Sequence, residues 1–350
     1  MTRTERLVLG GIALATVLAG VARYAGGVSE VVAFVLATIA LAGLAWVVSF
    51  ATEQLGERLG PAATGFMQST LGNLPEFFVV LFALNAGQLI VAETAILGSI
   101  LANALLVLGL VIVAGANHAR DGVMRFSPRL PNDTATLLLI STFIILLVAL
   151  ATSSHDPASH HVRTISIVGA VAILVVYGIW LRQYLSSGAG AQPGATPRLA
   201  MLTTLILLAS AGTASAFVSD WFVHALQPTI QQLHISKAFA GLVIVAIAGN
   251  AVENVTGIVL AAKGRSELAI SVVKNSVAQI AAFLYPALVL VSLLTATTLT
   301  FALAPIYVGA LFGTALIIWQ ITGDGEATLF EGSALVAAYL ILATVAAFEA

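Results

Sequence analysis

The chain has few charged side chains and no cysteine at all. Only 9% of its 350 residues are Asp, Glu, Lys or Arg, whereas a soluble globular domain carries about 25% charged residues. Without cysteine, the chain forms no disulfide and uses no thiol as a nucleophile or metal ligand. The formal net charge of −2 is also too small to indicate binding to nucleic acid or to an anionic membrane surface.

Long apolar runs are what the sequence has instead. Hydrophobic residues make up 59% of the chain, and the mean hydropathy is +1.04. A membrane-spanning helix needs about 20 mainly apolar residues, and eleven segments meet that requirement. They are residues 7–24, 28–50, 61–85, 91–116, 133–152, 163–182, 199–220, 236–262, 268–294, 298–319 and 330–348. The sequence therefore predicts an all-α, polytopic membrane protein with about 11 transmembrane helices.

Two features set the expected topology. The first segment resembles a signal peptide, but Arg23 and Tyr24 stand where a small-residue cleavage site belongs, so we expect a retained helix. Most loop Lys and Arg residues fall on the side of the N-terminus, which predicts a cytoplasmic N-terminus and an external C-terminus in a prokaryotic cytoplasmic membrane. The largest expected loops are 117–132, 183–198 and 221–235.

A repeated motif divides the chain. The sequence GNLPE runs from Gly72 to Glu76, and GNAVE runs from Gly249 to Glu253, at an offset of 177 residues that also relates Ser99 to Ser276. The two motifs lie on segments of opposite direction, which is the inverted-repeat pattern of secondary transporters. Between the two motifs, residues 186–198 are rich in Gly, Ser, Pro and Ala, and we expect them to form a flexible cytoplasmic linker.

The motif has the chemistry of a cation site. A glycine weakens the helix, and Pro75 cannot donate to the carbonyl of Leu71, so backbone oxygen becomes available inside the membrane. Carboxylates, amides and carbonyls are the ligands of a hard cation such as Ca²⁺. The predicted cation- and proton-binding residues are Asn73, Glu76, Asn250 and Glu253, with the two glutamates as the direct metal ligands.

The rarity of deep carboxylates supports this interpretation. Glu76 and Glu253 are the only carboxylates placed near mid-membrane by the predicted segments, where an ionised group costs about 2.5–3.5 kcal/mol on insertion scales. Helix capping is the alternative role for both. The predicted pathway-lining residues are Gly72, Gly249, Ser99, Asn103, Ser276 and Gln279. For the four polar ones, contact between helices is an equally good explanation.

Lys274 is the only basic residue that lies away from the ends of a predicted segment, and two roles stay open for it. Its stem can carry the ammonium to the membrane interface. Alternatively, the ammonium pairs with a pathway carboxylate and modulates cation binding. No zinc-protease, nucleophile-elbow or phosphate-binding-loop motif is present, so neither an enzyme nor a cofactor is predicted.

Around these residues the sequence resembles the Ca²⁺/H⁺ antiporter family within the Ca²⁺/cation antiporter superfamily. The similarity covers most of the chain and is strongest in stretches such as 51–84, LGSILANALLVLGL (97–110) and GLVIVAIAGNAVENVTGIVLAAKG (241–264). The resemblance implies a leading helix in 1–27 and five-helix repeats in 28–185 and 199–350. It also implies that Glu76 and Glu253 bind the transported cation and exchange protons. The chain departs from the family pattern at Lys274, where an apolar residue is usual.

Together these features predict a transporter that exchanges Ca²⁺ for H⁺ by alternating access. The expected partners are Ca²⁺ or another small cation, protons and the lipid bilayer. A Na⁺(K⁺)/H⁺ antiporter on the same fold is the first alternative. A cation channel is the second, since channels also use carboxylates and carbonyls.

Overall fold

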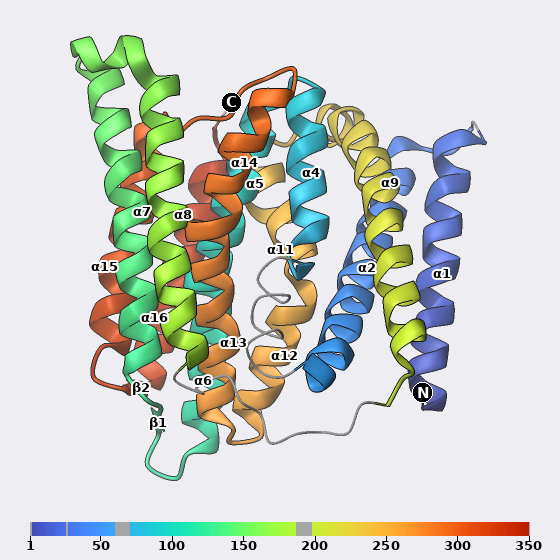
Figure 1. Cartoon of the computed structure of the whole chain (residues 1–350), viewed down its shortest axis with the longest axis horizontal. Helices are drawn as coiled ribbons and strands as arrows, with labels where there is room; N and C mark the ends of the chain where they lie inside the picture. Colours follow the sequence, from blue (N-terminus) through green and yellow to red (C-terminus); the bar gives the residue numbers. More distant parts are fainter. Residues whose placement is uncertain (1, 26, 60–70, 187–197, 350) are drawn as a thin grey trace. The chain divides into compact units, whose positions relative to one another are not determined.

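The computed structural model describes residues 2–25, 27–59, 71–186 and 198–349, without the side chains of 56–59, 185, 252 and 253. Helices dominate these ranges (Figure 1). The α-helices are α1 (Arg3–Tyr24), α2 (Glu30–Leu59), α4 (Leu74–Asn85), α5 (Leu89–Leu101), α6 (Leu108–His118), α7 (Arg129–Ser153), α8 (Val162–Ser186), α9 (Met201–Leu233), α10 (Lys237–Phe239), α11 (Ala246–Gly249), α12 (Ala251–Ala262), α13 (Ser266–Gln279), α14 (Tyr285–Val291), α15 (Pro305–Thr322) and α16 (Leu329–Ala347). The π-helices are η1 (Ala102–Val107), η3 (Ala240–Val245) and η4 (Ile280–Leu284), the 3-10 helices are η2 (Pro157–His161) and η5 (Ser292–Leu294), and the strands are β1 (Val123–Arg125) and β2 (Glu326–Thr328).

The helices confirm the prediction of a polytopic membrane protein. In the described ranges, nine helices are long and apolar enough to cross a membrane. A tenth span results if Lys237–Gly249 and Asn254–Ala262, which are bent by 59°, are taken together. The predicted segment 61–85 lies partly outside the described residues, and Leu74–Asn85 is its described apolar helix. The expected count of eleven therefore stays a prediction.

Two predicted boundaries are wrong. Residues 221–235 were expected to form a loop, but α9 continues as a helix to Leu233. The span predicted to begin at 298 begins at Pro305, because the preceding residues run as irregular chain and proline fits the first turn of a helix. Within this irregular stretch, the backbone N–H of Leu299 donates to Oγ of Ser292 over 2.9 Å.

The described residues fall into two compact units. Unit 1 takes its residues from Met1–Gln88 and Gly178–Ile235. In it α2 packs along α9, with the rings of Phe34 and Phe222 4.8 Å apart. The helix α1 lies against both, because Gly43 leaves room for Ile12 and Gly20 leaves room for Trp221. The first helix thus has close packing partners within this unit.

Unit 2 takes its residues from Leu89–Tyr177 and Ser236–Ala350. A small antiparallel sheet at one end of this unit joins the connection after α6 to the connection before α16, with Arg125 opposite Glu326 (Figure 1). The Arg125 guanidinium contacts Asp121 at 2.7 Å and Glu326 at 3.1 Å. Hydrogen bonding from Arg125 is the main reason why the pKa of the exposed Asp121 carboxyl lies below its usual value.

The local structure agrees with the repeat offset of 177 residues. Shifted by this offset, α4 coincides with α12, and both helices have 12 residues. The π-helix η1 similarly falls on η4. The division of the sequence into two inverted five-helix repeats remains a prediction, since each compact unit contains residues from both halves of the chain.

Candidate functional site

In unit 1 the first motif interrupts a helix. Gly72 and Asn73 form a turn, and α4 begins at Leu74 with Pro75 in its first turn. Proline is well placed there because the first amide groups of a helix have no partner within it. Glu76 follows immediately and is only 6% exposed. The break thus places a carboxylate in the interior of unit 1, at the start of a helix, where the helix dipole favours negative charge.

A helix of the second half packs at this break. Ser219 on α9 donates a hydrogen bond to the carbonyl oxygen of Pro75 over 3.4 Å. Asn73 is 4% exposed, and among the described residues its Nδ2 has no acceptor. A buried amide donor without a partner is uncommon, because its desolvation is costly. Ser219 was not among the residues predicted from the sequence, although a serine within a predicted span is a recognisable polar signal.

In unit 2 the second motif interrupts a helix in nearly the same geometry. Asn250 lies between α11, which ends at Gly249, and α12, which carries Glu253. Its backbone angles are φ −97° and ψ 10°, and those of Asn73 are φ −96° and ψ 17°. The two asparagines therefore cap their helices in matching conformations. The side chain of Glu253 lies outside the described residues.

Three polar side chains meet at this second break. Asn250 Nδ2 donates to Oγ of Ser99 over 3.0 Å, and Asn103 Nδ2 donates to Oδ1 of Asn250 over 2.8 Å. All three residues are buried, with exposures of 3% or less. The sequence placed Ser99 and Asn103 near the pathway, and the structure joins both to Asn250.

The Asn103 amide has one unused acceptor. Its Nδ2 also donates to the carbonyl oxygen of Ser99 over 2.9 Å, which fixes the orientation of the amide. Within the described part of the chain, its buried Oδ1 has no hydrogen-bond donor. A fixed, desolvated carbonyl oxygen of this kind is suited to a hard cation. The sequence predicted a ligand role for Asn250 and only a pathway-lining role for Asn103.

Glycines bring these side chains together. A Cβ on Gly98 would lie 2.3 Å from the carbonyl oxygen of Leu242, and a Cβ on Gly241 would lie 2.0 Å from Oγ1 of Thr94. α5 and η3 therefore approach backbone to backbone, which only small residues permit. The small-x-x-x-small spacing of Thr94 and Gly98 is the sequence signal for this crossing.

Two of the candidate residues flank π-helices. Asn103 lies within η1, and Gln279 is the residue directly before η4. A π-helical turn interrupts the regular hydrogen-bond ladder and often marks a functional site. Ser276 is buried at 2% exposure and Gln279 is partly buried. The place of both residues in the pathway stays a prediction.

Lys274 is buried within unit 2. It is 0% exposed, and its Nζ donates to Oγ1 of Thr322 on α15 over 3.0 Å. Thr322 in turn donates to the carbonyl oxygen of Ile318. The ammonium thus lies inside unit 2, at the residue that ends α15, and both sequence-based roles of Lys274 stay predictions. No ion pair of the described residues includes Lys274.

The donor set of both breaks consists of oxygen ligands only. Across the described ranges, no three His, Asp or Glu side chains gather as a metal cluster. The available groups are a buried carboxylate in unit 1, and amide and hydroxyl oxygens in unit 2. Such a set suits a cation that is bound and released, because Ca²⁺ accepts neutral oxygens alongside carboxylates.

Comparison with known proteins gives concordant results. The chain is 30% identical over 318 residues to the "Ca(2+)/H(+) antiporter ChaA" of Bacillus subtilis, covering 89% of this chain and 91% of that protein. It is 30% identical over 320 residues to the "Vacuolar calcium ion transporter" of Schizosaccharomyces pombe, covering 88% and 77% respectively. A solved structure described as "Structure of native YfkE" matches with a TM-score of 0.79 at 27% identity, covering 98% and 99%.

A family model described as "Sodium/calcium exchanger protein" matches residues 29–182 and 203–348, which include both Gly-Asn-x-x-Glu motifs. These ranges contain most of the described helices. The chain is therefore an integral membrane protein that belongs to the sodium/calcium exchanger protein family.

Proposed function

We propose that this protein exchanges Ca²⁺ for H⁺ across a prokaryotic cytoplasmic membrane. The observation that carries the proposal is the pair of helix breaks at Asn73 and Asn250, with matching backbone geometry and a glutamate three residues after each. Glu76, the described one of these glutamates, is buried. The names of two similar proteins, a Ca²⁺/H⁺ antiporter and a calcium ion transporter, support Ca²⁺ as the cation.

Competition for a buried carboxylate would couple the two ions. A carboxylate in a low-dielectric interior needs compensation for its charge, which either a proton or a cation supplies. A site of two glutamates, Glu76 and Glu253, would therefore accept one Ca²⁺ or two protons without a change in total charge. Binding of either ion excludes the other, which is the requirement for obligatory exchange.

The neighbouring residues would complete the cation's oxygen shell. In unit 2, Asn250 Oδ1 already accepts a hydrogen bond from Asn103, whereas Asn103 Oδ1 is buried without a donor among the described residues. We therefore add Asn103 Oδ1 to the proposed ligands and assign Ser99 to the positioning of Asn250. Asn73 has the corresponding place beside Glu76 in unit 1.

Alternating access and orientation complete the proposal. Inverted-repeat transporters expose a central site to one side of the membrane at a time, and the offset that relates α4 to α12 supports that architecture. The excess of Lys and Arg in the loops on the N-terminal side supports a cytoplasmic N-terminus and an external C-terminus.

Ion exchange in proteoliposomes tests the function. Purified protein is reconstituted, a pH gradient is imposed, and uptake of Ca²⁺, Na⁺, K⁺ and Mn²⁺ is compared. We expect Ca²⁺ to dissipate the proton gradient in the wild type. Preferred movement of Na⁺ or K⁺ would change the assigned cation, and Ca²⁺ conduction without proton movement would indicate a channel.

Substitution of the two carboxylates tests the site. Glu76→Gln and Glu253→Gln should each abolish exchange while the proteins stay monodisperse, because an amide neither titrates nor neutralises a cation. Glu326→Gln, at the exposed ion pair with Arg125, is the matched control and should retain exchange. Wild-type exchange in either Glu76→Gln or Glu253→Gln would remove that residue from the mechanism.

A further inference from the structure

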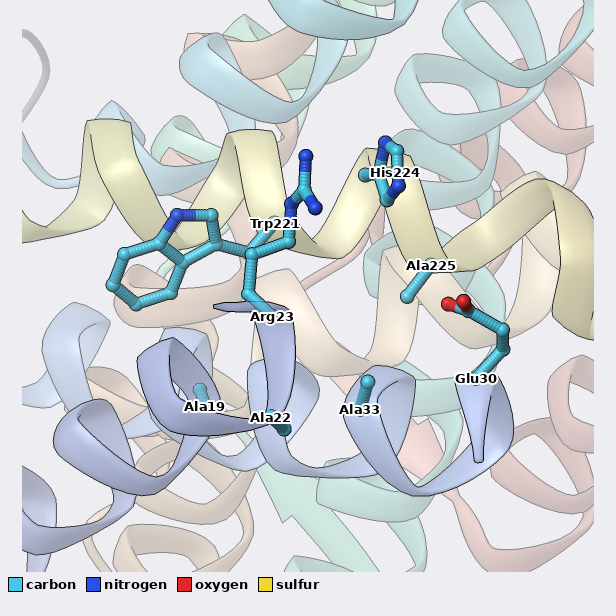
Figure 2. A pocket seen from close by; sticks show the side chains of 8 residues that line it. All are labelled: Ala19, Ala22, Arg23, Glu30, Ala33, Trp221, His224 and Ala225. Atoms are coloured by element: carbon cyan, nitrogen blue, oxygen red, sulfur yellow. The ribbon is translucent and has the colours of Figure 1, made fainter. Parts of the chain in front are cut away.

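Unit 1 contains a small pocket between three helices (Figure 2). Its walls come from the end of α1, the start of α2 and the second half of α9. Alanines form much of its lining, and Arg23, Glu30, Trp221 and His224 supply its polar groups. None of these residues belongs to the proposed exchange site.

The helices place this pocket at the depth of lipid headgroups. Arg23 lies at the end of one span and Glu30 at the start of the next. Along α9, Trp221 lies about 30 Å from Met201 at 1.5 Å per residue, which is about the thickness of the hydrocarbon core. Trp221 donates from Nε1 to the hydroxyl oxygen of Tyr24 over 3.3 Å, and such Trp and Tyr pairs are typical of the membrane interface.

The positive group in the pocket has unused hydrogen-bonding capacity. The Arg23 guanidinium lies 5.3 Å from the ring centre of Tyr24, and its side chain extends between Trp221 and His224 (Figure 2). Its buried Nε has no acceptor among the described residues. A guanidinium is the usual partner of a phosphate group, which it can bind through two parallel hydrogen bonds.

The negative group belongs to the same pocket but does not neutralise Arg23. The Glu30 carboxylate points toward Ala225 (Figure 2), and no ion pair of the described residues joins Glu30 to Arg23. The pocket therefore presents one positive and one negative group separately. That arrangement is complementary to a ligand that carries both charges.

The size of the pocket selects the positive group of such a ligand. Its volume of about 30 Å³ admits roughly two water-sized groups, since one water needs about 10–15 Å³. A primary ammonium is water-sized and has three N–H donors for a carboxylate. A trimethylammonium is larger and has none, and Arg23 already lies over the ring of Tyr24, where a quaternary ammonium would bind.

We propose that this pocket binds the headgroup of phosphatidylethanolamine. The ammonium enters the cavity beside Glu30, and the phosphate is held by Arg23 with His224 next to it. The acyl chains then lie along the exposed apolar side chains of Val17, Val21 and Phe217, which are 61%, 52% and 58% exposed. A neutral, zwitterionic lipid matches the opposite charges of Arg23 and Glu30.

Lipid binding to the full-length protein tests the proposal. The protein is delipidated in detergent and titrated with phosphatidylethanolamine or phosphatidylcholine of identical acyl chains, and bound lipid is counted by native mass spectrometry. We expect phosphatidylethanolamine to reach half-occupancy at an about tenfold lower concentration than phosphatidylcholine, because one charged hydrogen bond distinguishes them. Equal binding of the two lipids by the wild type would overturn the proposal.

Variants test which part of the headgroup each of the two charged side chains binds. Glu30→Gln should remove the preference for phosphatidylethanolamine, and Arg23→Gln should weaken the binding of both lipids about tenfold. Arg163→Gln, which removes an exposed arginine at the start of α8, is the matched control and should change neither value. A preference that survives in Glu30→Gln, or an Arg23→Gln protein that binds like the control, would contradict the assignment.

Two further measurements test whether the cavity itself is needed and whether the ligand is a lipid or a free headgroup. Ala33→Leu fills the pocket without removing a charge and should abolish the preference, so the test holds even if Arg23→Gln does not fold. Soluble phosphoethanolamine should displace the lipid only at far higher concentration, because it lacks the acyl chains. Displacement at equal concentration would show that the pocket binds a free headgroup, and would refute the lipid.

Discussion

Asn103 donates a hydrogen bond from Nδ2 to Oδ1 of Asn250 over 2.8 Å, although 147 residues separate them in the sequence. The contact links η1 to the break before α12 inside unit 2. Both residues are buried, at 0% and 2% exposure. The bond therefore orients the amide of the second motif from outside the motif itself.

Asn103→Ala should destabilise unit 2 and weaken cation binding. It removes the donor to Asn250 Oδ1, and leaving a buried polar group short of a partner costs about 1–3 kcal/mol. Thermal unfolding in detergent and the half-saturating Ca²⁺ concentration of exchange measure the two effects. Asn132→Ala removes a longer, less buried bond to Gly323 at 3.3 Å and should have a smaller effect. Equal unfolding temperatures for the two variants would contradict this ranking.

Gly98→Ala should separate α5 from η3. The added Cβ would lie 2.3 Å from a backbone oxygen of Leu242, which cannot rotate away as a side chain can. Overpacking of this kind typically costs about 1–3 kcal/mol, and we expect lower thermal stability together with slower exchange. Gly309→Ala is the control, since a Cβ there meets no atom within 4 Å. If both variants melt like the wild type, the close crossing is not structurally important.

Lys274→Met should keep or raise stability and leave the pH dependence of exchange unchanged. Methionine has a similar volume, and replacing a buried charged residue by an apolar one is often neutral or stabilising. Thr322 retains its own bond to Ile318. Apparent Ca²⁺ affinity measured against pH decides the matter, and a shifted curve in the variant would instead show that the ammonium acts on the cation site.

The exposed ion pairs of the β1–β2 sheet should open in acid. The pKa of Asp121 is depressed, mainly by hydrogen bonding from Arg125, so its stabilising contribution is present above the unfolded pKa of about 3.9 and is lost as the pH falls through the lower folded value. Amide hydrogen exchange at Met124 and Arg125, compared between wild type and Arg125→Gln, measures this contribution. The difference should shrink with salt and vanish in strong acid, and a constant difference would exclude the ion pair as its source.

The membrane fold and both helix breaks could be predicted because they depend on local composition. Apolar runs of the length of a bilayer identify spans, and glycine with Pro75 identifies a weak point in a helix. The position of Ser99 also followed from the offset between the motifs. The hydrogen bond from Asn103 to Asn250 could not be predicted, because the spacing of residues within one helix does not determine which distant helix packs against it.

The error at residues 221–235 has a specific cause. The stretch contains His224 and Pro228, yet a helix that extends beyond the hydrocarbon core carries polar residues without penalty. Phe222, Leu226 and Ile230 are buried at 0%, 2% and 6% exposure, and they recur every four residues. That periodicity was the available sign of a helix. The burial of Lys274, by contrast, depends on where α15 lies, and its own segment contains no information on that.

The pairing of α2 with α9 has a consequence for biosynthesis. The rings of Phe34 and Phe222 lie in contact, but Met201, where α9 begins, is translated long after α2 ends at Leu59. At about 5–20 residues per second this interval is on the order of ten seconds. During that time the buried face of α2 has only lipid, the insertion machinery or earlier helices as neighbours. If translation stopped before Met201, unit 1 would therefore stay unassembled. If the two halves of the chain were expressed separately, unit 1 would form only when both halves were present.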